Sequence, residues 1–155
     1  MSKRLIIDLA DHRATSRFGE TLGSRLRGGE VIELSSDLGG GKTTLVSSIV
    51  RGTGSGDHVS SPSFTVRNDY RAEDFQVAHF DFYRLGDVGI VREMLKEAIA
   101  DPLTTVVIEW GDAVRRVLPE QRVTITLTVT GSDSRRADIT YPSSLSYLFK
   151  GMASQ

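Results

Sequence analysis

The sequence predicts a three-layer α/β domain with a mainly parallel sheet and an antiparallel C-terminal extension. The segment 31–34 is a short apolar strand with Val31, Ile32 and Leu34, and the segment 104–110 is almost continuously apolar, which is typical of a strand buried in a parallel sheet. A helical pattern follows the first segment, and an alternating pattern with a hairpin occupies the C-terminal part. We therefore expect helices on both faces of the sheet and a functional site at the carboxyl ends of its strands.

The overall composition limits the classes of protein to consider. The 155 residues, 39% hydrophobic and 25% charged, fit a single globular domain over residues 1–155. No apolar run approaches the roughly 20 residues of a membrane-spanning helix, so we expect a cytoplasmic protein with no membrane contact. The absence of cysteine excludes disulfides and thiolate metal sites. A net charge of −1 argues against strong independent binding of nucleic acid, although a partner can bring RNA to the chain.

A short strand at 5–9 and a helix at 14–27 are expected first. Phe18, Leu22 and Leu26 share one helical face, whose simplest role is core packing, and Gly28 with Gly29 ends the helix. His12 and Thr15 belong to the start of this helix. They either have no function beyond the helix start or reach a nucleotide base from a neighbouring loop.

A glycine-rich turn joins the strand at 31–34 to the next helix, whose buried side carries Leu45, Val46, Ile49 and Val50. Glycines let successive N–H groups point inward, and the helix N-terminus adds its positive dipole end, so the turn suits phosphate. Lysine supplies charge to the outer phosphates, and the hydroxyl of Thr43 suits Mg²⁺. The residues of this phosphate loop are Gly39, Gly40, Gly41, Lys42, Thr43 and Thr44.

The loop departs from the pattern G-x-x-x-x-G-K-[ST] because Ser36 occupies the position of the first glycine. Serine costs about 1–2 kcal/mol there if the backbone needs a positive φ, and nothing otherwise. A plain flexible turn is the alternative interpretation. The strand before the loop and the helix after it favour a nucleotide-binding loop.

Two later strands end in acids. The strand expected at 76–83 places His79, Asp81 and Tyr83 on one face, and the strand at 104–110 ends in Glu109 and Trp110. In P-loop proteins such an acid positions Mg²⁺ or the attacking water, whereas many other edge acids are merely solvated. Asp81 has a further alternative, an ion pair with Arg84. From the sequence alone, Trp110 is expected in the core.

The remaining segments complete the expected fold. The polar run at 59–66 is either a plain loop or a switch that follows the γ-phosphate, and 88–100 is expected to be helical. The alternating segment 122–129 is expected to be antiparallel and half-exposed, with a hairpin partner at 134–141 and a short closing helix. Its inward residues are expected to be Val123, Ile125, Leu127 and Val129, and those of the closing helix are Leu145, Leu148 and Phe149.

Several separated motifs together resemble the TsaE (YjeE) family. They are A-T-x-x-F-G at 14–19, D-L-G-G-G-K-T-T at 37–44, S-P-S-F-T at 61–65, H-F-D-F-Y-R-L at 79–85 and V-I-E-W at 107–110. The resemblance implies a small P-loop ATPase that uses ATP and Mg²⁺. It also implies action with TsaB and TsaD in threonylcarbamoyl modification of adenosine 37 of tRNA, with TsaD carrying out the transfer.

The resemblance also implies roles for individual residues. Residues 39–44 would hold the phosphates, and Thr43 and Glu109 would hold Mg²⁺. Asp81 would lie near the γ-phosphate with Trp110 beside it, residues 61–65 would be the switch, and His12 and Thr15 would meet the base. The chain departs from the family at Ser36, where glycine is usual, at Gly40, where alanine is usual, and at Gly111, where proline is frequent.

Three activities remain compatible with the sequence. The first is hydrolysis of ATP by in-line attack of water, with Lys42 and Mg²⁺ neutralising the developing charge and Asp81 or Glu109 orienting the water. No arginine lies within the phosphate loop, so we expect slow hydrolysis that rises when a partner completes the site. The others are a small-molecule kinase, which lacks an evident arginine-rich lid, and a nucleotide-gated binding module.

Overall fold

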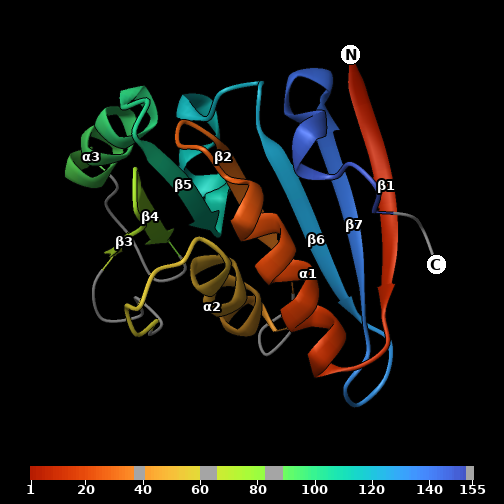
Figure 1. Ribbon diagram of the computed structural model, residues 1–155. Helices are drawn as coiled ribbons and strands as arrows, with labels where there is room; N and C mark the ends of the chain where they lie inside the picture. Colours follow the sequence, from red (N-terminus) through yellow and green to blue (C-terminus); the bar gives the residue numbers. More distant parts are fainter. Residues whose placement is uncertain (37–40, 60–65, 83–88, 153–155) are drawn as a thin grey trace.

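The computed structural model describes residues 1–36, 41–59, 66–82 and 89–152, which form one seven-stranded sheet with helices packed against it (Figure 1). The strands are β1 (Ser2–Leu9), β2 (Val31–Ser35), β3 (Arg67–Arg71), β4 (Gln76–Asp81), β5 (Thr104–Glu109), β6 (Val123–Val129) and β7 (Arg135–Pro142). The helices are α1 (His12–Arg25), α2 (Lys42–Gly52), α3 (Gly89–Ala100) and the 3₁₀ helices η1 (Gly111–Val117) and η2 (Ser143–Leu148). No helix in these described ranges is long and apolar enough to cross a membrane.

The centre of the sheet is parallel, as the fold class requires. The strand order is β1-β7-β6-β2-β5-β4-β3, in which β6, β2, β5 and β4 pair in parallel. The C-terminal hairpin β6–β7 adds the expected antiparallel extension, and β1 joins it at the edge. The three-layer P-loop class of fold is thereby confirmed.

Two pairings differ from the sequence prediction. The segment expected to be antiparallel, β6, is antiparallel only to β7 and pairs in parallel with β2 on its other side. Antiparallel pairing also occurs at the opposite edge, between β3 and β4. The alternating pattern of β6 reflects one exposed face, which does not distinguish the direction of its neighbours.

Helices cover both faces of the sheet. On one face α1 and α2 bury a cluster that includes Leu22, Leu45, Ile49 and Val107, each with no exposed surface. On the other face α3 and η1 pack against Phe80 and Ile108, through side chains that include Leu95 and Val114. Residues at alternate positions of a strand share a face, so each central strand contributes to both clusters.

The boundaries of α1 follow from its caps. The helix begins two residues before the predicted start because the Asp11 carboxylate accepts a hydrogen bond from Ala14 N at 2.8 Å. It ends at Arg25 because Leu26 adopts an extended backbone and donates its N–H to Gly23 O. The glycine pair expected to end the helix lies slightly beyond this cap.

One expected core residue is exposed. Val129 was predicted to point inward, but 51% of its surface is accessible to solvent, whereas Val123, Ile125 and Leu127 are buried. Val129 is the last residue of β6, next to the turn of the hairpin. The expected closing helix is confirmed as η2 and places Leu148 and Phe149 in the core.

Candidate nucleotide-binding site

The site begins at the N-terminus of α2. Gly41 precedes the helix with φ of 98°, a left-handed conformation that suits glycine, and no side chain of the described residues caps the helix. Within the described ranges the first backbone N–H groups of α2 therefore lack a capping side chain, and they lie at the positive end of the helix dipole. Gly39 and Gly40, and the expected switch at 61–65, lie outside the described residues.

Lys42 is buried, with 8% of its surface exposed, although it carries a charge. Its Nζ donates to Ser36 O at 3.4 Å and lies 4.1 Å from the centroid of the Trp110 ring. A carbonyl and an aromatic face offset only part of the cost of desolvating an ammonium group. The surroundings of Lys42 therefore fit a further anionic partner such as a phosphate.

The backbone at Trp110 is unusual. Its φ of 59° makes it the one non-glycine residue with positive φ in the described part of the chain. The left-handed conformation ends β5 and begins η1, and it accompanies the contact of the ring with Lys42. Trp110 thus belongs both to the edge of the core and to the site. Because Ser36 does not have positive φ, serine causes no backbone strain there.

The two predicted acids are neighbours at the ends of β4 and β5. Asp81 is the register partner of Glu109, and Glu109 is also the register partner of Leu34, near the end of β2. Both acids lie on the same sheet face as Val77 and Val107, which pack with α2. The topology therefore brings Asp81 and Glu109 to the edge of the sheet from which the phosphate loop departs.

Glu109 has a buried histidine partner that the sequence did not assign to it. His79 Nε2 lies 2.6 Å from Glu109 Oε2, and the two residues are 1% and 4% exposed. The other ring nitrogen, Nδ1, is buried without a hydrogen-bond partner in the described structure. A ring N–H at Nε2 in this arrangement donates to the Glu109 carboxylate.

The donor set suits a magnesium ion bound mostly by ligand oxygens. The described residues contain no group of three or more His, Asp or Glu arranged to hold a metal by themselves. Mg²⁺ in nucleotide sites typically takes one or two protein oxygens, and phosphates and water supply the rest. Thr43, exposed in the first turn of α2, and Glu109 provide oxygens of the required kind.

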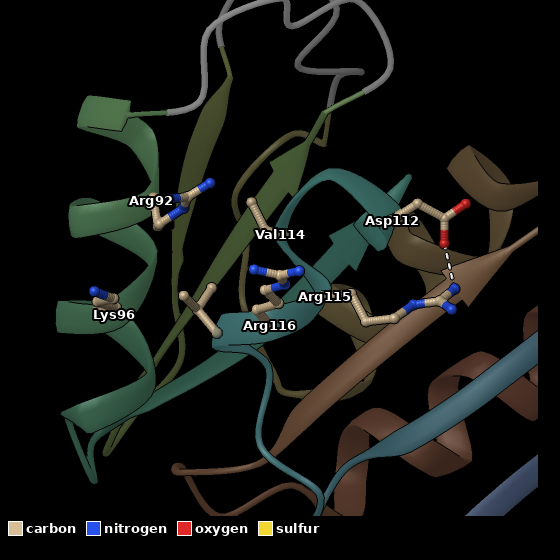
Figure 2. Close-up of a pocket in the computed structure, with 7 residues that line it drawn as sticks. Arg92, Lys96, Asp112, Val114, Arg115 and Arg116 are labelled. Carbon is tan, nitrogen blue, oxygen red and sulfur yellow. Dashed lines mark hydrogen bonds and ion pairs between the residues drawn. The ribbon is translucent and has the colours of Figure 1, made fainter.

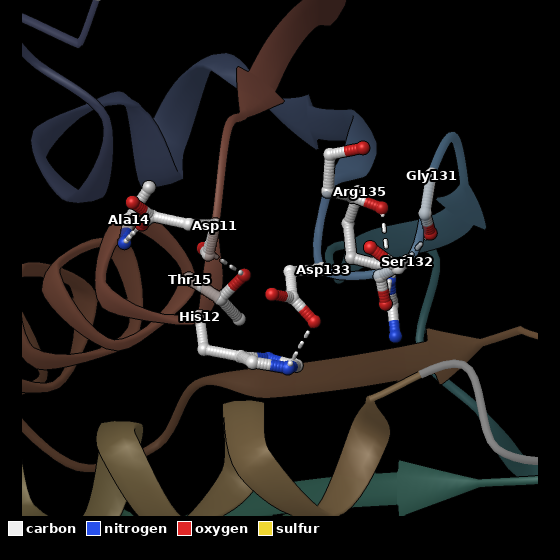
Figure 3. A network of polar contacts seen from close by, with 9 residues as sticks. Asp11, His12, Ala14, Thr15, Gly131, Ser132, Asp133 and Arg135 are labelled. Atoms are coloured by element: carbon white, nitrogen blue, oxygen red, sulfur yellow. Dashed lines mark hydrogen bonds and ion pairs between the residues drawn. The ribbon is translucent and has the colours of Figure 1, made fainter.

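The predicted base contacts lie beside the β6–β7 hairpin (Figure 3). His12 Nε2 is 3.2 Å from Asp133 Oδ1, and both side chains are largely exposed. Thr15 is only 2% exposed and donates its hydroxyl to Asp11 O at 3.4 Å. His12 is therefore open to a ligand, whereas the Thr15 hydroxyl is engaged with its own helix.

An arginine from the same hairpin reaches the phosphate loop. Arg135 is 8% exposed and donates to the carbonyls of Gly131, Ser132 and Ser134, at 2.8 Å for the last. A Cβ built on Gly41 would lie 3.6 Å from Arg135 Nε. The sequence analysis did not identify Arg135 as a site residue. Its position depends on the parallel pairing of β6 with β2, which brings the hairpin to this edge of the sheet.

The fold and the placement of Lys42 define a P-loop α/β protein. Comparison with protein families adds that the model described as "Threonylcarbamoyl adenosine biosynthesis protein TsaE" matches residues 9–137. The chain belongs to the TsaE family, as the motifs predicted.

Individual relatives agree with this assignment. Proteins named "tRNA threonylcarbamoyladenosine biosynthesis protein TsaE" are 36% identical in Nostoc sp., covering 86% of this chain and 84% of the relative, and 32% identical in Treponema pallidum, covering 81% and 92%. The crystal structure of Bacillus subtilis YdiB superposes with a TM-score of 0.75 at 23% identity and covers 96% of this chain and 93% of that one. This structural similarity supports the fold.

Proposed function

We propose that this chain is a Mg²⁺-dependent ATPase of the cytoplasm that supports threonylcarbamoyl modification of adenosine 37 in tRNA, together with TsaB and TsaD. The chain meets tRNA only indirectly, through that complex. The observation that carries the proposal is the buried Lys42 at the start of α2, next to the strand ends that bear Asp81 and Glu109. Family membership supplies the pathway, because the relatives are named for biosynthesis of threonylcarbamoyladenosine.

The proposed binding site divides the nucleotide among several elements. The loop 39–44 and the N-terminus of α2 hold the phosphates, with Lys42 directed to the outer ones. Arg135, beside Gly41, adds a second cation to this side of the site. His12 and Thr15 approach the base. The exposed side chain of His12 supports a contact with the base.

The proposed reaction is attack of water on the γ-phosphoryl group. Thr43 and Glu109 would hold Mg²⁺, which would neutralise part of the phosphate charge. His79 fixes the orientation of the Glu109 carboxylate through the 2.6 Å hydrogen bond. Either Asp81, which lies one strand away, or Glu109 itself orients the water in this proposal. The protein contributes positioning and electrostatics rather than a covalent intermediate.

Release of inorganic phosphate tests the proposal directly. We expect slow release from ATP by the isolated chain without an acceptor, and faster release when the TsaB–TsaD complex is added. Glu109→Ala should abolish the Mg²⁺-dependent rate and still bind nucleotide in EDTA. If the wild-type chain does not bind adenine nucleotide, the proposed ATPase activity is wrong. If phosphate is transferred only to an added acceptor, the chain is a kinase.

A further inference from the structure

A basic cleft lies outside the nucleotide site, between α3 and η1 (Figure 2). It has a volume of about 530 Å³. Its lining residues include four cations, Arg92 and Lys96 from α3 and Arg115 and Arg116 from η1, but only one acid. This concentration of positive charge is notable in a chain whose net charge is −1.

Two of the four cations of the cleft are paired with an acid in the described part of the chain, and two are not. Arg115 is paired with Asp112, and Lys96 with Glu93 at 3.2 Å. Arg92 and Arg116 form no ion pair with any residue that the structure describes. Figure 2 shows them on facing elements, Arg92 on the helix and Arg116 on the 3₁₀ turn. Two guanidinium groups therefore line a shared space, and neither is paired with a carboxylate of the described residues.

A small part of the cleft wall is apolar. Val114 is 2% exposed and belongs to the core beneath the cleft, and Val117 lies partly exposed beside it. Guanidinium groups bind carboxylates through two parallel hydrogen bonds, and apolar surface next to arginine is typical of the centre of a protein–protein interface. The cleft thus offers contacts both for acidic and for apolar side chains.

Several features favour a protein over a nucleic acid as the occupant. Binding along a phosphate backbone requires an extended stripe of cations, whereas these four form a compact group with Asp112 and Glu93 among them. The low net charge of the chain also gives no general attraction for a polyanion. A short acidic segment with apolar side chains matches both the size and the walls of the cleft.

We propose that the cleft between α3 and η1 is the docking site for an acidic segment of a partner protein. Carboxylates of the partner bind Arg92 and Arg116, and its apolar side chains cover the exposed part of Val117. The existence of a partner rests on the proposed function, whereas the assignment of the surface rests on the charges and the cleft. Docking there also reaches the nucleotide site, because η1 begins one residue after Trp110, whose ring lies over Lys42.

The test compares two double variants of the full chain. Arg92→Ala/Arg116→Ala removes the unpaired guanidinium groups, and Arg4→Ala/Arg136→Ala removes the same charge from the exposed β1–β7 edge. In calorimetric titration with TsaB–TsaD, the first variant should bind at least about tenfold more weakly, and the control should bind like the wild type. Binding of a non-hydrolysable ATP analogue should be unchanged in both. Equal affinity of the cleft variant and the wild type would overturn the proposal.

A second probe separates this proposal from the proposed function. If the wild-type chain does not bind TsaB–TsaD, the proposed partnership is wrong, and the cleft is tested with a labelled peptide of alternating glutamate and leucine. Binding that is lost in Arg92→Ala/Arg116→Ala supports the cleft, and absence of binding to the wild type refutes it. Tighter binding of a short uridine oligonucleotide, lost in the same variant, would show that the occupant is RNA and that the proposal is wrong.

Discussion

Lys42 is buried and charged, and among the described residues it contacts the Ser36 carbonyl and the Trp110 ring but no carboxylate. A structural lysine at such a position would usually be paired, because an isolated buried ammonium is strongly disfavoured. A phosphate bound as proposed would relieve this conflict. This single side chain therefore links the stability of the free protein to its affinity for a nucleotide.

Replacement of Lys42 by alanine should weaken nucleotide binding. A charge-assisted hydrogen bond contributes about 1.5–3 kcal/mol, so we expect Lys42→Ala to lower the affinity for a non-hydrolysable ATP analogue by roughly 10- to 150-fold. Calorimetric titration measures this change. Lys3→Ala, on the exposed end of β1, removes the same charge and should leave the affinity unaltered. Similar affinities for both variants would exclude Lys42 from the phosphate site.

His79 should control the metal dependence of the site through Glu109. His79→Ala removes the donor to a buried carboxylate, so the Mg²⁺ concentration needed to perturb Trp110 fluorescence in the presence of ATP should rise. Trp110 is the only tryptophan, which makes the signal specific. His79→Gln retains an N–H donor and should restore part of the Mg²⁺ response. If alanine and glutamine variants respond identically to Mg²⁺, His79 serves packing alone.

At the scale of elements, α1 and α2 approach closely because glycines line their contact. A Cβ built on Gly23 would lie 2.0 Å from Ile49 O, and one on Gly52 would lie 2.2 Å from Glu20 O. Both distances involve backbone atoms, which cannot move without displacing a helix. The packing of α1 thus depends on the same helix that begins at the phosphate loop.

Gly23→Ala should destabilise the protein although alanine is the better helix former. The gain in helix propensity is about 1 kcal/mol, but the overlap with Ile49 O forces the helices apart, and overpacking of this kind typically costs about 1–3 kcal/mol. Denaturant unfolding should show a net loss of stability. Ser24→Ala, one residue further on the exposed side of α1, provides the control and should change the stability little. A stabilised Gly23→Ala variant would contradict the close packing.

The elements that could be predicted are those with a local signal. The buried strand β5 and the apolar face of α2 follow from residue spacing within a single segment, and both appear as expected. The parallel neighbour of β6 could not be predicted, because alternation reports exposure and says nothing about which strand lies alongside.

The residues of the candidate site also differ in whether a local sequence signal predicts their position. The acids at the strand ends could be predicted because the carboxyl ends of parallel strands meet at one edge. The hydrogen bond of His79 with Glu109 and the approach of Arg135 to Gly41 depend on strand order and register. Such contacts join residues that are distant in the sequence, and no periodicity within a segment encodes them.

At the scale of the whole molecule, one buried carboxylate joins distant parts of the chain. Glu30 is 3% exposed and accepts hydrogen bonds from the backbone N–H groups of Arg27 and Gly28, at 2.8 and 2.9 Å. Thr105 in β5 donates to it at 2.7 Å, and the Tyr147 hydroxyl in η2 donates at 2.6 Å. The carboxylate therefore connects the α1–β2 loop, the central sheet and the C-terminal turn.

Tyr147 makes this connection sensitive to alkaline pH. Burial of the phenol raises its pKa above the ordinary value of 10.0, and the hydrogen bond to Glu30 raises it further, although Arg27 nearby acts in the opposite direction. Above pH 10 the unfolded chain loses this proton while the folded chain retains it, so the free energy of unfolding must fall as the pH rises. One proton gives a slope of up to about 1.4 kcal/mol per pH unit.

Tyr147→Phe should lower the free energy of unfolding at neutral pH and reduce its dependence on pH above pH 10. At neutral pH we expect a loss of about 1.5–3 kcal/mol, because Glu30 loses a donor while the ring and its contact with the Arg27 guanidinium remain. Above pH 10 the stability of the variant should fall less steeply than that of the wild type, so the two curves converge. Tyr141→Phe is the matched control, since among the described residues its hydroxyl has no hydrogen bond, and it should retain the wild-type slope. Denaturant unfolding across this pH range measures all three proteins, and parallel curves for the wild type and Tyr147→Phe would show that Tyr147 does not couple folding to pH.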